Sequence, residues 1–375
     1  MKEIVLIEGK KVYEKGKFIS RSFLIKEGKV FPVDRTEIST FAEKRKAFLI
    51  IPPFADAHIH GGWEYSFEEP ESYPRLEKLL KSKGIFLAVP TLMSLSIEKA
   101  SRIASTFLEY KKSNPDSIFP FLRIEGPFIN PEKAGFQKRS TFLQPQEKEM
   151  EAFFNLSPSV KMFTFAPELE GSKDLVRRAR ERGMIPSAGH SNASFADFAE
   201  IYHLGVRHMT HFPNAMRGLH HREIGLTGAG FYFQDVTLEV IGDGVHLSFD
   251  FLRLLNQIKH RERIHLVSDA LPPAGLEKGK VNGREVRLEG GVFLDQEGKI
   301  AGGALMVDEQ FRLLHFQAGF PLDILVDWAC LNFLRFLGIG EDFLKEGEPA
   351  HFIALDEELR FSFGFFRGKE INPSY

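Results

Sequence analysis

The sequence predicts an α/β protein built on a (β/α)8 barrel of TIM type, with a small β-sandwich domain formed by both ends of the chain. Through the middle of the chain, eight apolar strand-like runs alternate with helical segments, and both ends carry short β-type runs separated by Gly-containing turns. Strands that alternate with helices form parallel sheets, and eight such units close into a barrel of ~250 residues. We therefore expect a β-sandwich of residues 1–50 and 346–375 and a barrel of residues 51–345.

Both ends of the chain contain short apolar runs that precede Gly-containing turns. Ile4–Ile7 precedes Glu8-Gly9, and Phe23–Ile25 precedes Glu27-Gly28. The C-terminal part repeats this with His351–Leu355 and with Phe361–Phe366 before a further Arg-Gly turn. Short apolar runs bounded by such turns are typical of strands. We expect strands from both ends to lie in one domain.

The barrel strands are expected at apolar runs between these ends. One is the segment that leads into His58, and the others are Ile85–Pro90, Ile118–Ile124, Val160–Phe165, Ile185–Ala188, His208–Thr210, Leu238–Ile241 and Ile264–Ser268. Helix signals fall between them. Ser194 followed by Asp197 resembles a capping box, and Leu252, Leu255 and Ile258 mark one face of a later helix.

Composition excludes several function classes. Hydrophobic residues make up 43% and charged residues 27%, which is enough to bury a large core. With 49 basic and 51 acidic residues the net charge is −2, so we expect no nucleic-acid partner. No stretch approaches the ~18 consecutive apolar residues of a membrane span. The single cysteine, Cys330, cannot form an intrachain disulfide, which favours a reducing cytoplasm.

Polar residues stand where the expected strands end. They are His58 and His60 at the first strand, Glu125 at the third, His190 at the fifth, His211 at the sixth and Asp269 at the eighth. The carboxyl ends of barrel strands meet at one mouth, so these residues become neighbours. Four imidazoles and two carboxylates in one place predict a divalent metal site.

The ligand types favour Zn²⁺ or Fe²⁺ over Mg²⁺ or Ca²⁺, because imidazole is a borderline donor and the alkaline-earth ions prefer oxygen. A lone His-x-His pair is a common chance pattern, and a lone strand-end Asp is more often a cap or turn residue. The joint pattern outweighs these alternatives. Four further histidines are expected to be surface or core residues in helical or solvated contexts, namely His203, His260, His265 and His315.

At these motifs the sequence resembles the N-acetylglucosamine-6-phosphate deacetylases of the amidohydrolase superfamily. The resemblance runs in order from about residue 4 to residue 368. Its blocks are Asp56–Gly62, Glu125–Phe128, Gly189–Ala193, Thr210-His211 with Asn214–Met216, Asp243–His246, and Ser268–Ala270 through Pro273–Gly275. It implies a metal-dependent barrel and a sugar-phosphate substrate with an N-acetyl group.

Residue roles follow from the resemblance. Glu125, His190 and His211 would hold the principal ion, and His58 and His60 would support a second, giving one or two ions per subunit. Asp269 matches the catalytic acid/base, which we expect to take a proton from the attacking water and pass it to the leaving nitrogen. His246 would hold the carbonyl oxygen as it gains charge. Products would be glucosamine 6-phosphate and acetate.

Substrate contacts are implied at a further set of positions, namely Gln137, Asn214, Ala215, Arg222, His246, Ala301, Gly302 and Gly303. Arg222 is the best phosphate ligand because a guanidinium binds phosphate through two parallel hydrogen bonds. Without the resemblance, a solvated surface charge would be the preferred interpretation of Arg222. Enzymes of this family are typically homodimers whose matching arginine reaches the neighbouring site, so we expect the same here.

Two alternatives remain at this point. Another amidohydrolase, such as a cyclic amidase or an aminohydrolase, would share the metal ligands but would not need Asn214, Ala215 and Arg222. A catalytically silent sugar-phosphate-binding homologue would not need Asp269 or the complete ligand set. A requirement for the substrate phosphate, and acetate release itself, discriminate among them.

Overall fold

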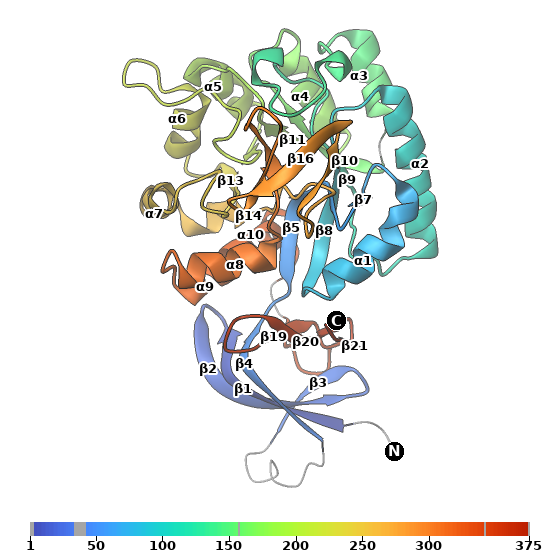
Figure 1. Cartoon of the computed structure of the whole chain (residues 1–375), viewed down its shortest axis with the longest axis vertical. Coiled ribbons are helices and arrows are strands. Elements are labelled where there is room, and N and C mark those ends of the chain that lie inside the picture. Colours follow the sequence, from blue (N-terminus) through green and yellow to red (C-terminus); the bar gives the residue numbers. More distant parts are fainter. Residues whose placement is uncertain (1–3, 34–42, 157, 341–342, 374–375) are drawn as a thin grey trace. The chain divides into compact units, whose positions relative to one another are not determined.

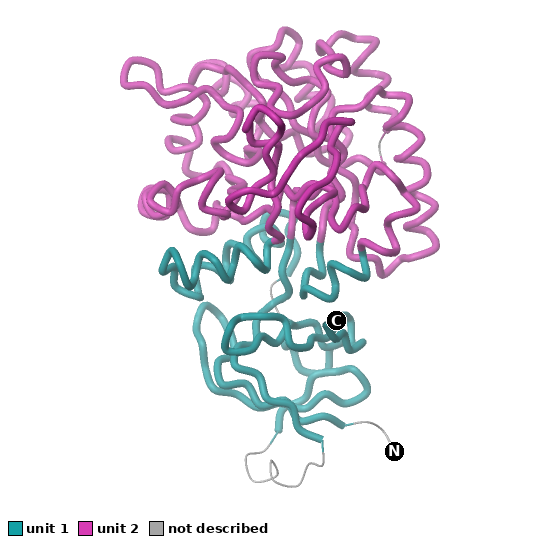
Figure 2. Tube along the Cα trace, viewed as in Figure 1, with its two compact units in different colours: residues 1–55, 77–87, 307–375 teal, residues 56–76, 88–306 magenta. Residues whose placement is uncertain are grey.

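The computed structural model describes residues 4–33, 43–156, 158–340 and 343–373. The chain divides into two compact units (Figure 2), one of residues 1–55, 77–87 and 307–375 and the other of residues 56–76 and 88–306. This division cuts through barrel elements, since β8 (Ile85–Leu92) contributes to both units. The domain boundaries expected after residues 50 and 345 therefore stay a prediction.

An eight-stranded parallel sheet forms the barrel among the described residues (Figure 1), in the order β14-β13-β12-β11-β10-β9-β8-β5. Besides β8, its strands are β5 (Phe54–Ile59), β9 (Leu122–Ile124), β10 (Val160–Phe165), β11 (Ile185–Ala188), β12 (His208–Met209), β13 (Thr237–Val240) and β14 (Ile264–Leu266). A parallel bridge between Ile59 and Ala270 joins the two edges. The predicted barrel is confirmed, with strands at all eight expected places.

Helices follow the barrel strands along the chain. They are α1 (Tyr73–Lys81), α2 (Ile97–Ser113), α3 (Glu147–Phe154), α4 (Ser172–Glu181), α5 (Phe195–His203), α6 (Gly225–Tyr232), α7 (Phe249–Ile258), α8 (Val307–Phe316), α9 (Leu322–Val326) and α10 (Asn332–Phe336). The capping box of α5 is present, with Ser194 and Asp197 exchanging hydrogen bonds. Leu252 and Leu255 of α7 are buried as expected, but Ile258, the last residue of the helix, is 42% exposed.

A four-stranded antiparallel sheet is inserted between β14 and α8. It consists of β15 (Lys278–Val281), β16 (Arg284–Glu289), β17 (Val292–Leu294) and β18 (Ile300–Gly303). A further parallel bridge joins Ala270 to Gly303, so this sheet continues from the end of the last barrel strand. No helix among the described residues has the length and hydropathy needed to cross a membrane.

Both ends of the chain contribute to one seven-stranded sheet, in the order β21-β20-β19-β4-β1-β2-β3. Its strands are β1 (Ile4–Glu14), β2 (Lys17–Lys26), β3 (Lys29–Pro32), β4 (Lys44–Ile51), β19 (Phe352–Leu355), β20 (Phe361–Phe366) and β21 (Lys369–Ile371). The rings of Phe23 in β2 and Phe352 in β19 lie 5.4 Å apart, although β1 and β4 stand between these strands in the sheet. The sheet therefore curls over its own core, as a sandwich does.

Two tight turns, next to the edge strands β3 and β21 of this curled sheet, contact each other. Gly28 and Gly368 have φ values of +74° and +81°, and a Cβ on Gly28 would lie 2.5 Å from the Gly368 carbonyl oxygen. Ala350 lies between the two turns: its N–H donates to the Gly28 carbonyl and its carbonyl accepts from the Gly368 N–H, each at 2.8 Å. Glycine is required here because the backbone is left-handed and the two turns touch.

Candidate active site

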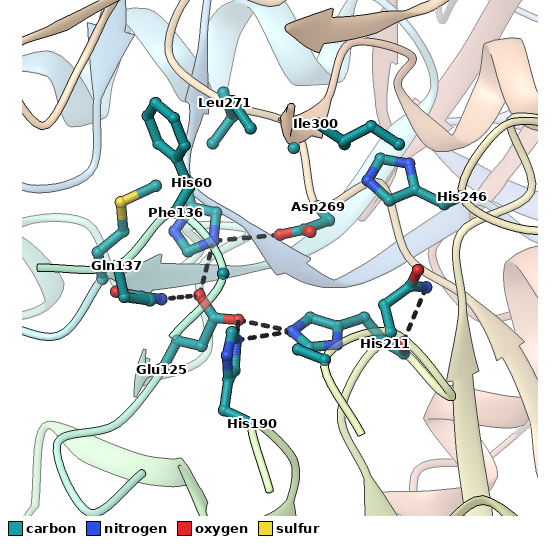
Figure 3. A pocket seen from close by; sticks show the side chains of 16 residues that line it. His60, Glu125, Phe136, Gln137, His190, His211, His246, Asp269, Leu271 and Ile300 are labelled. Atoms are coloured by element: carbon teal, nitrogen blue, oxygen red, sulfur yellow. Dashed lines mark hydrogen bonds and ion pairs between the residues drawn. The ribbon is translucent and has the colours of Figure 1, made fainter. Parts of the chain in front are cut away.

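The polar strand-end residues converge at one end of the barrel (Figure 3). His58 lies within β5 and His60 follows it, and because alternate residues of a strand face the same side, both rings turn into the barrel. The remaining members each follow a strand directly or within three residues: Glu125 after β9, His190 after β11, His211 after β12 and Asp269 after β14. All six side chains are at most 14% exposed.

One half of the cluster is built around Glu125. Its Oε1 lies 2.8 Å from His190 Nε2 and 2.7 Å from His211 Nε2. The two imidazole Nε2 atoms lie 3.1 Å from each other. Two ring nitrogens and one carboxylate oxygen are therefore directed at a common point.

The other half is built around the His-x-His pair. The Nε2 atoms of His58 and His60 lie 3.2 Å apart, and Asp269 Oδ1 lies 3.4 Å from the first and 3.2 Å from the second. The second oxygen of Glu125, Oε2, lies 3.4 Å from His60 Nε2. Glu125 thus stands between the two halves, with one oxygen on each side.

Hydrogen bonds at Nδ1 set the direction in which the rings present a lone pair. His190 Nδ1 donates to the Lys133 carbonyl at 2.6 Å, and His60 Nδ1 donates to the Thr91 carbonyl at 3.0 Å. A proton fixed on Nδ1 leaves Nε2 of a neutral ring as an acceptor facing the cluster. Such an outer bond is the usual support of a metal-binding histidine.

The electrostatics of the cluster favour a cation. Burial raises the pKa of the Glu125 carboxyl, but the His190 and His58 imidazoles outweigh it and hold that pKa well below its usual range. Burial lowers the pKa of His60, but hydrogen bonds to Asp269 and Glu125 raise it to about 10. Both pKa shifts arise because the buried carboxylates of Glu125 and Asp269 and the nearby imidazoles attract each other's charges. A divalent ion would supply this positive charge in place of protons.

The donor set fits a divalent metal. Two groups of three donors, His58 with His60 and Glu125, and Glu125 with His190 and His211, each place one atom per residue within 4.8 Å of one another. Imidazole nitrogens with a few carboxylate oxygens suit Zn²⁺ or Fe²⁺ better than an all-oxygen ion. The residues present therefore fit the ion expected from the sequence.

Several site residues hold unusual backbone conformations. His190, His211 and Asp269 have φ values of +47°, +30° and +48°, and Ala215 has +54°. Left-handed backbone costs a residue with a side chain about 1–2 kcal/mol and concentrates at functional sites. The turns at His190, His211 and Asp269 direct these side chains from strand ends into the barrel mouth.

A cavity of about 190 Å³ opens beside the cluster. Its lining residues are His60, Met93, Glu125, Gly135, Phe136, Gln137, His190, His211, Asn214, Ala215, His246, Asp269, Leu271, Ile300, Ala301 and Gly302. Most positions expected to contact substrate therefore surround one space. Two expected positions do not line this cavity: Gly303, where a Cβ would lie 2.2 Å from the Ser268 carbonyl oxygen, and Arg222, which is exposed.

Two side chains of the cavity are held by specific partners. Gln137 donates from Nε2 to Glu125 Oε2 and accepts from the Ser94 N–H at 2.8 Å, so its amide is engaged by the cluster. His246 Nδ1 donates to Asp243 Oδ2 at 2.6 Å, and Asp243 Oδ1 accepts two backbone N–H groups of the same turn. The hydrogen bond to Asp243 therefore fixes the His246 ring with Nδ1 as its donor.

A buried polar layer in the barrel interior was not expected from the sequence. Arg123 in β9 and Glu239 in β13 form an ion pair, and both are fully buried. His265 was expected in a helical or solvated context, but it lies in β14, is fully buried and stands 4.0 Å from Glu239. The available signal was one charged residue inside an otherwise apolar strand, as in Leu122-Arg123-Ile124 and Leu238-Glu239-Val240.

Comparisons with known proteins place the chain in a family. No protein-family model matches it. The crystal structure of N-acetylglucosamine-6-phosphate deacetylase from Thermotoga maritima is 32% identical, with a TM-score of 0.85, over 99% of this chain and 100% of that one. The N-acetylgalactosamine-6-phosphate deacetylase of Escherichia coli O157:H7 is 27% identical over 92% of this chain and 93% of its own length.

A second curated relative, the N-acetylglucosamine-6-phosphate deacetylase of Lysinibacillus sphaericus, is 28% identical over 83% of this chain and 82% of its own length. The matches span both chain ends and the barrel with its strand-end cluster. The chain belongs to the N-acetylglucosamine-6-phosphate deacetylase family of the amidohydrolase superfamily.

Proposed function

We propose that the protein hydrolyses the acetamide of N-acetylglucosamine 6-phosphate to glucosamine 6-phosphate and acetate. The observation that supports this most directly is the pairing of a complete His and Glu cluster with an ionised carboxylate, Asp269, on the wall of one cavity, in a chain of this family. A catalytically silent binder would need neither feature. Metal-dependent hydrolysis of an amide needs both.

The proposed ligands of the principal ion are Glu125, His190 and His211, with His58 and His60 supporting a second ion. Zinc or ferrous iron suits these donors. When bound, a divalent ion lowers the pKa of a water molecule and polarises the scissile carbonyl. Glu125 and the histidines position these charges, and the Nδ1 bonds of His60 and His190 keep the rings oriented.

Asp269 is the proposed proton carrier. Although burial raises the pKa of its carboxyl, His58 and the hydrogen bond to His60 hold the pKa below its usual value, so the group is ionised and able to accept a proton. It accepts the proton of the attacking water and later donates it to the leaving nitrogen, which lets one carboxylate serve both steps. The amine then leaves in its neutral form.

His246 is proposed to hold the acetyl oxygen. Asp243 accepts the hydrogen bond of its Nδ1–H and thereby orients the imidazole. A ring that carries a proton on both nitrogens would donate its Nε2–H to the oxygen as negative charge develops there. A donor of this kind typically contributes ~3–4 kcal/mol of barrier reduction.

The substrate phosphate is proposed to bind Arg222 of a second subunit. Among the described residues that line the cavity none is Lys or Arg, although a phosphate needs a cation. Arg222 lies on an exposed segment just before α6, and two apolar side chains nearby in sequence, Leu219 and Tyr232, are 56% and 66% exposed. A homodimer that covers these side chains would place the Arg222 guanidinium at the neighbouring cavity.

We also propose a cytoplasmic location, since the single cysteine is a buried free thiol.

A second candidate substrate is N-acetylgalactosamine 6-phosphate, because one relative that matches 92% of this chain is named as a deacetylase of that sugar. The two sugars differ only in the orientation of one hydroxyl group. A cyclic amidase or aminohydrolase is less well supported, since neither would require a phosphate contact.

Acetate release from the two phosphorylated sugars and from unphosphorylated N-acetylglucosamine, at equal concentrations, tests the proposal. We expect kcat/KM to be highest for N-acetylglucosamine 6-phosphate and at least 100-fold lower without the phosphate. A preference for the galactose epimer would reassign the substrate. Equal kcat/KM values with and without the substrate phosphate would contradict the proposal. The Asp269→Asn variant, prepared in the same way, controls for acetate release by a contaminating hydrolase.

A further inference from the structure

A buried ion pair stands directly behind the proposed metal ligands. Arg123 and Glu239 are both fully buried, and Arg123 contacts both carboxylate oxygens of Glu239. Arg123 also donates to the Ala57 carbonyl at 3.0 Å and to Thr210 Oγ1 at 2.9 Å. These neighbours immediately precede His58 and His211 in the chain, so the guanidinium anchors both strand ends.

Glu239 itself contacts the two ligand histidines. Its Oε2 lies 3.3 Å from His58 Nδ1 and accepts the backbone N–H of His211 at 3.0 Å. The first contact places the proton of a neutral His58 on Nδ1 and leaves Nε2 as an acceptor directed at His60 and Asp269. The second fixes the backbone of His211, whose φ of +30° is strained.

Stability alone does not explain a charged pair in this place. Replacing a buried ion pair by apolar residues of similar volume is often neutral or stabilising, because desolvation offsets the attraction. The Glu239 carboxylate accepts from the ring of His58 and from the backbone N–H of His211, and the first contact affects metal binding. It suppresses the His58 tautomer with the proton on Nε2, which would direct an N–H at the ion. An apolar side chain in place of Glu239 would allow that tautomer.

We infer that Glu239, held in place by Arg123, is a positioning residue that fixes the tautomer of His58 and the backbone of His211 and thereby sets the affinity for the second metal ion. The inference rests on the proposed metal site. The effect on the two ions is unequal. Both contacts are made to Oε2, but His58 depends on the carboxylate charge for the position of its ring proton, whereas His211 reaches the same oxygen through a backbone N–H, which has no alternative proton position.

Glu239→Gln is the direct test. In metal-free protein labelled with ¹⁵N-histidine, wild-type His58 should be protonated on Nδ1, and the variant should show a mixture of tautomers, with the signal assigned by its loss in His58→Asn. Titration with Co²⁺, followed by calorimetry and visible absorption, should show the second ion bound at least tenfold more weakly by the variant and the first within about threefold of wild type.

Two further variants separate positioning from folding. Arg123→Met combined with Glu239→Gln leaves no unpaired guanidinium, so it should regain thermal stability relative to Glu239→Gln while the second ion remains weak. Thr164→Val removes a buried hydroxyl 3.5 Å from Arg123 without touching Glu239 and should bind both ions as wild type does.

The outcomes are distinguishable. An unchanged His58 tautomer, or a second ion bound normally by Glu239→Gln, would overturn the inference. So would equal weakening of both ions, because that would indicate a purely structural role, and so would a wild type that binds only one ion. A wild type that binds no divalent ion would instead contradict the proposed function itself.

Discussion

Replacing Asp269 by asparagine removes the proposed proton carrier with little structural cost. The backbone of Asp269 has a φ of +48°, a conformation that asparagine tolerates as well as aspartate does. Its N–H bond to the His58 carbonyl, 2.9 Å long, does not involve the side chain. The amide occupies the same volume, so the fold and the cavity should persist.

The size of the effect follows from the contacts. General acid–base catalysis contributes ~10²–10⁴-fold in rate, or about 3–5 kcal/mol of barrier. Asp269 Oδ1 is 3.2 Å from His60 Nε2 and 3.4 Å from His58 Nε2, on the wall of the cavity, and an amide there cannot accept the proton of an attacking water. We expect kcat to fall by that factor and KM to stay within about threefold.

Steady-state acetate release gives kcat, calorimetry gives substrate affinity, and metal analysis shows whether the variant keeps its ions. Asp308→Asn is the matched control, because Asp308 is a buried carboxyl in α8, outside the cavity, and its loss should leave kcat unchanged. A metal-replete Asp269→Asn enzyme that retains more than about a tenth of wild-type kcat, roughly 1.4 kcal/mol of barrier, would refute the assignment.

Three further predictions concern the subunit contact, the metal count and acid stability. Homodimers of Arg222→Ala and of Asp269→Asn should each be nearly inactive, yet mixed dimers should regain activity toward half of wild type; heterodimers as inactive as their parents would place Arg222 outside the neighbouring site. His190→Asn should abolish binding of the principal ion, whereas the His58→Asn and His60→Asn double variant should retain one ion with a milder loss of activity, as metal analysis and acetate release can show. Burial, with a smaller contribution from Arg367, lowers the pKa of His351 from 6.5 to about 4. The unfolded chain therefore takes up a proton that the native state lacks as pH falls from 6.5 to 4, and stability is lost in that window by at most about 3.4 kcal/mol. Denaturant unfolding at pH 7.5 and 5 should show a smaller loss for His351→Phe, whose ring would pack against Phe86 and Phe366 as the imidazole does; equal losses would contradict this.

The barrel could be predicted because its strands are buried on both faces. Parallel strands of this kind appear as short apolar runs, and β10 and β13 lie where such runs stand in the sequence. The strand-end positions of His190 and His211 follow from the same pattern, since a polar residue after a buried run must stand at the barrel mouth. The helical spacing of apolar residues was a less reliable guide to burial at the end of α7, where Ile258 is exposed.

The buried polar layer could not be predicted in the same way. Arg123 and Glu239 are far apart in sequence, and each alone weakens the case for a strand. Only the closed barrel places the two charges against each other and lets each compensate the desolvation of the other. The helical or solvated context expected for His265 was wrong, because the residue lies inside the expected strand Ile264–Ser268, where a core position is the consistent prediction.

Acetate release from N-acetylglucosamine 6-phosphate, measured on one preparation before chelation, after chelation and after restoring Zn²⁺ or Fe²⁺, tests the central claim most directly. We predict hydrolysis by the untreated enzyme, loss of at least 99% of it on chelation, and recovery with the restored ion. Full activity in protein shown to be metal-free, or no acetate release from metal-loaded protein, would contradict the account.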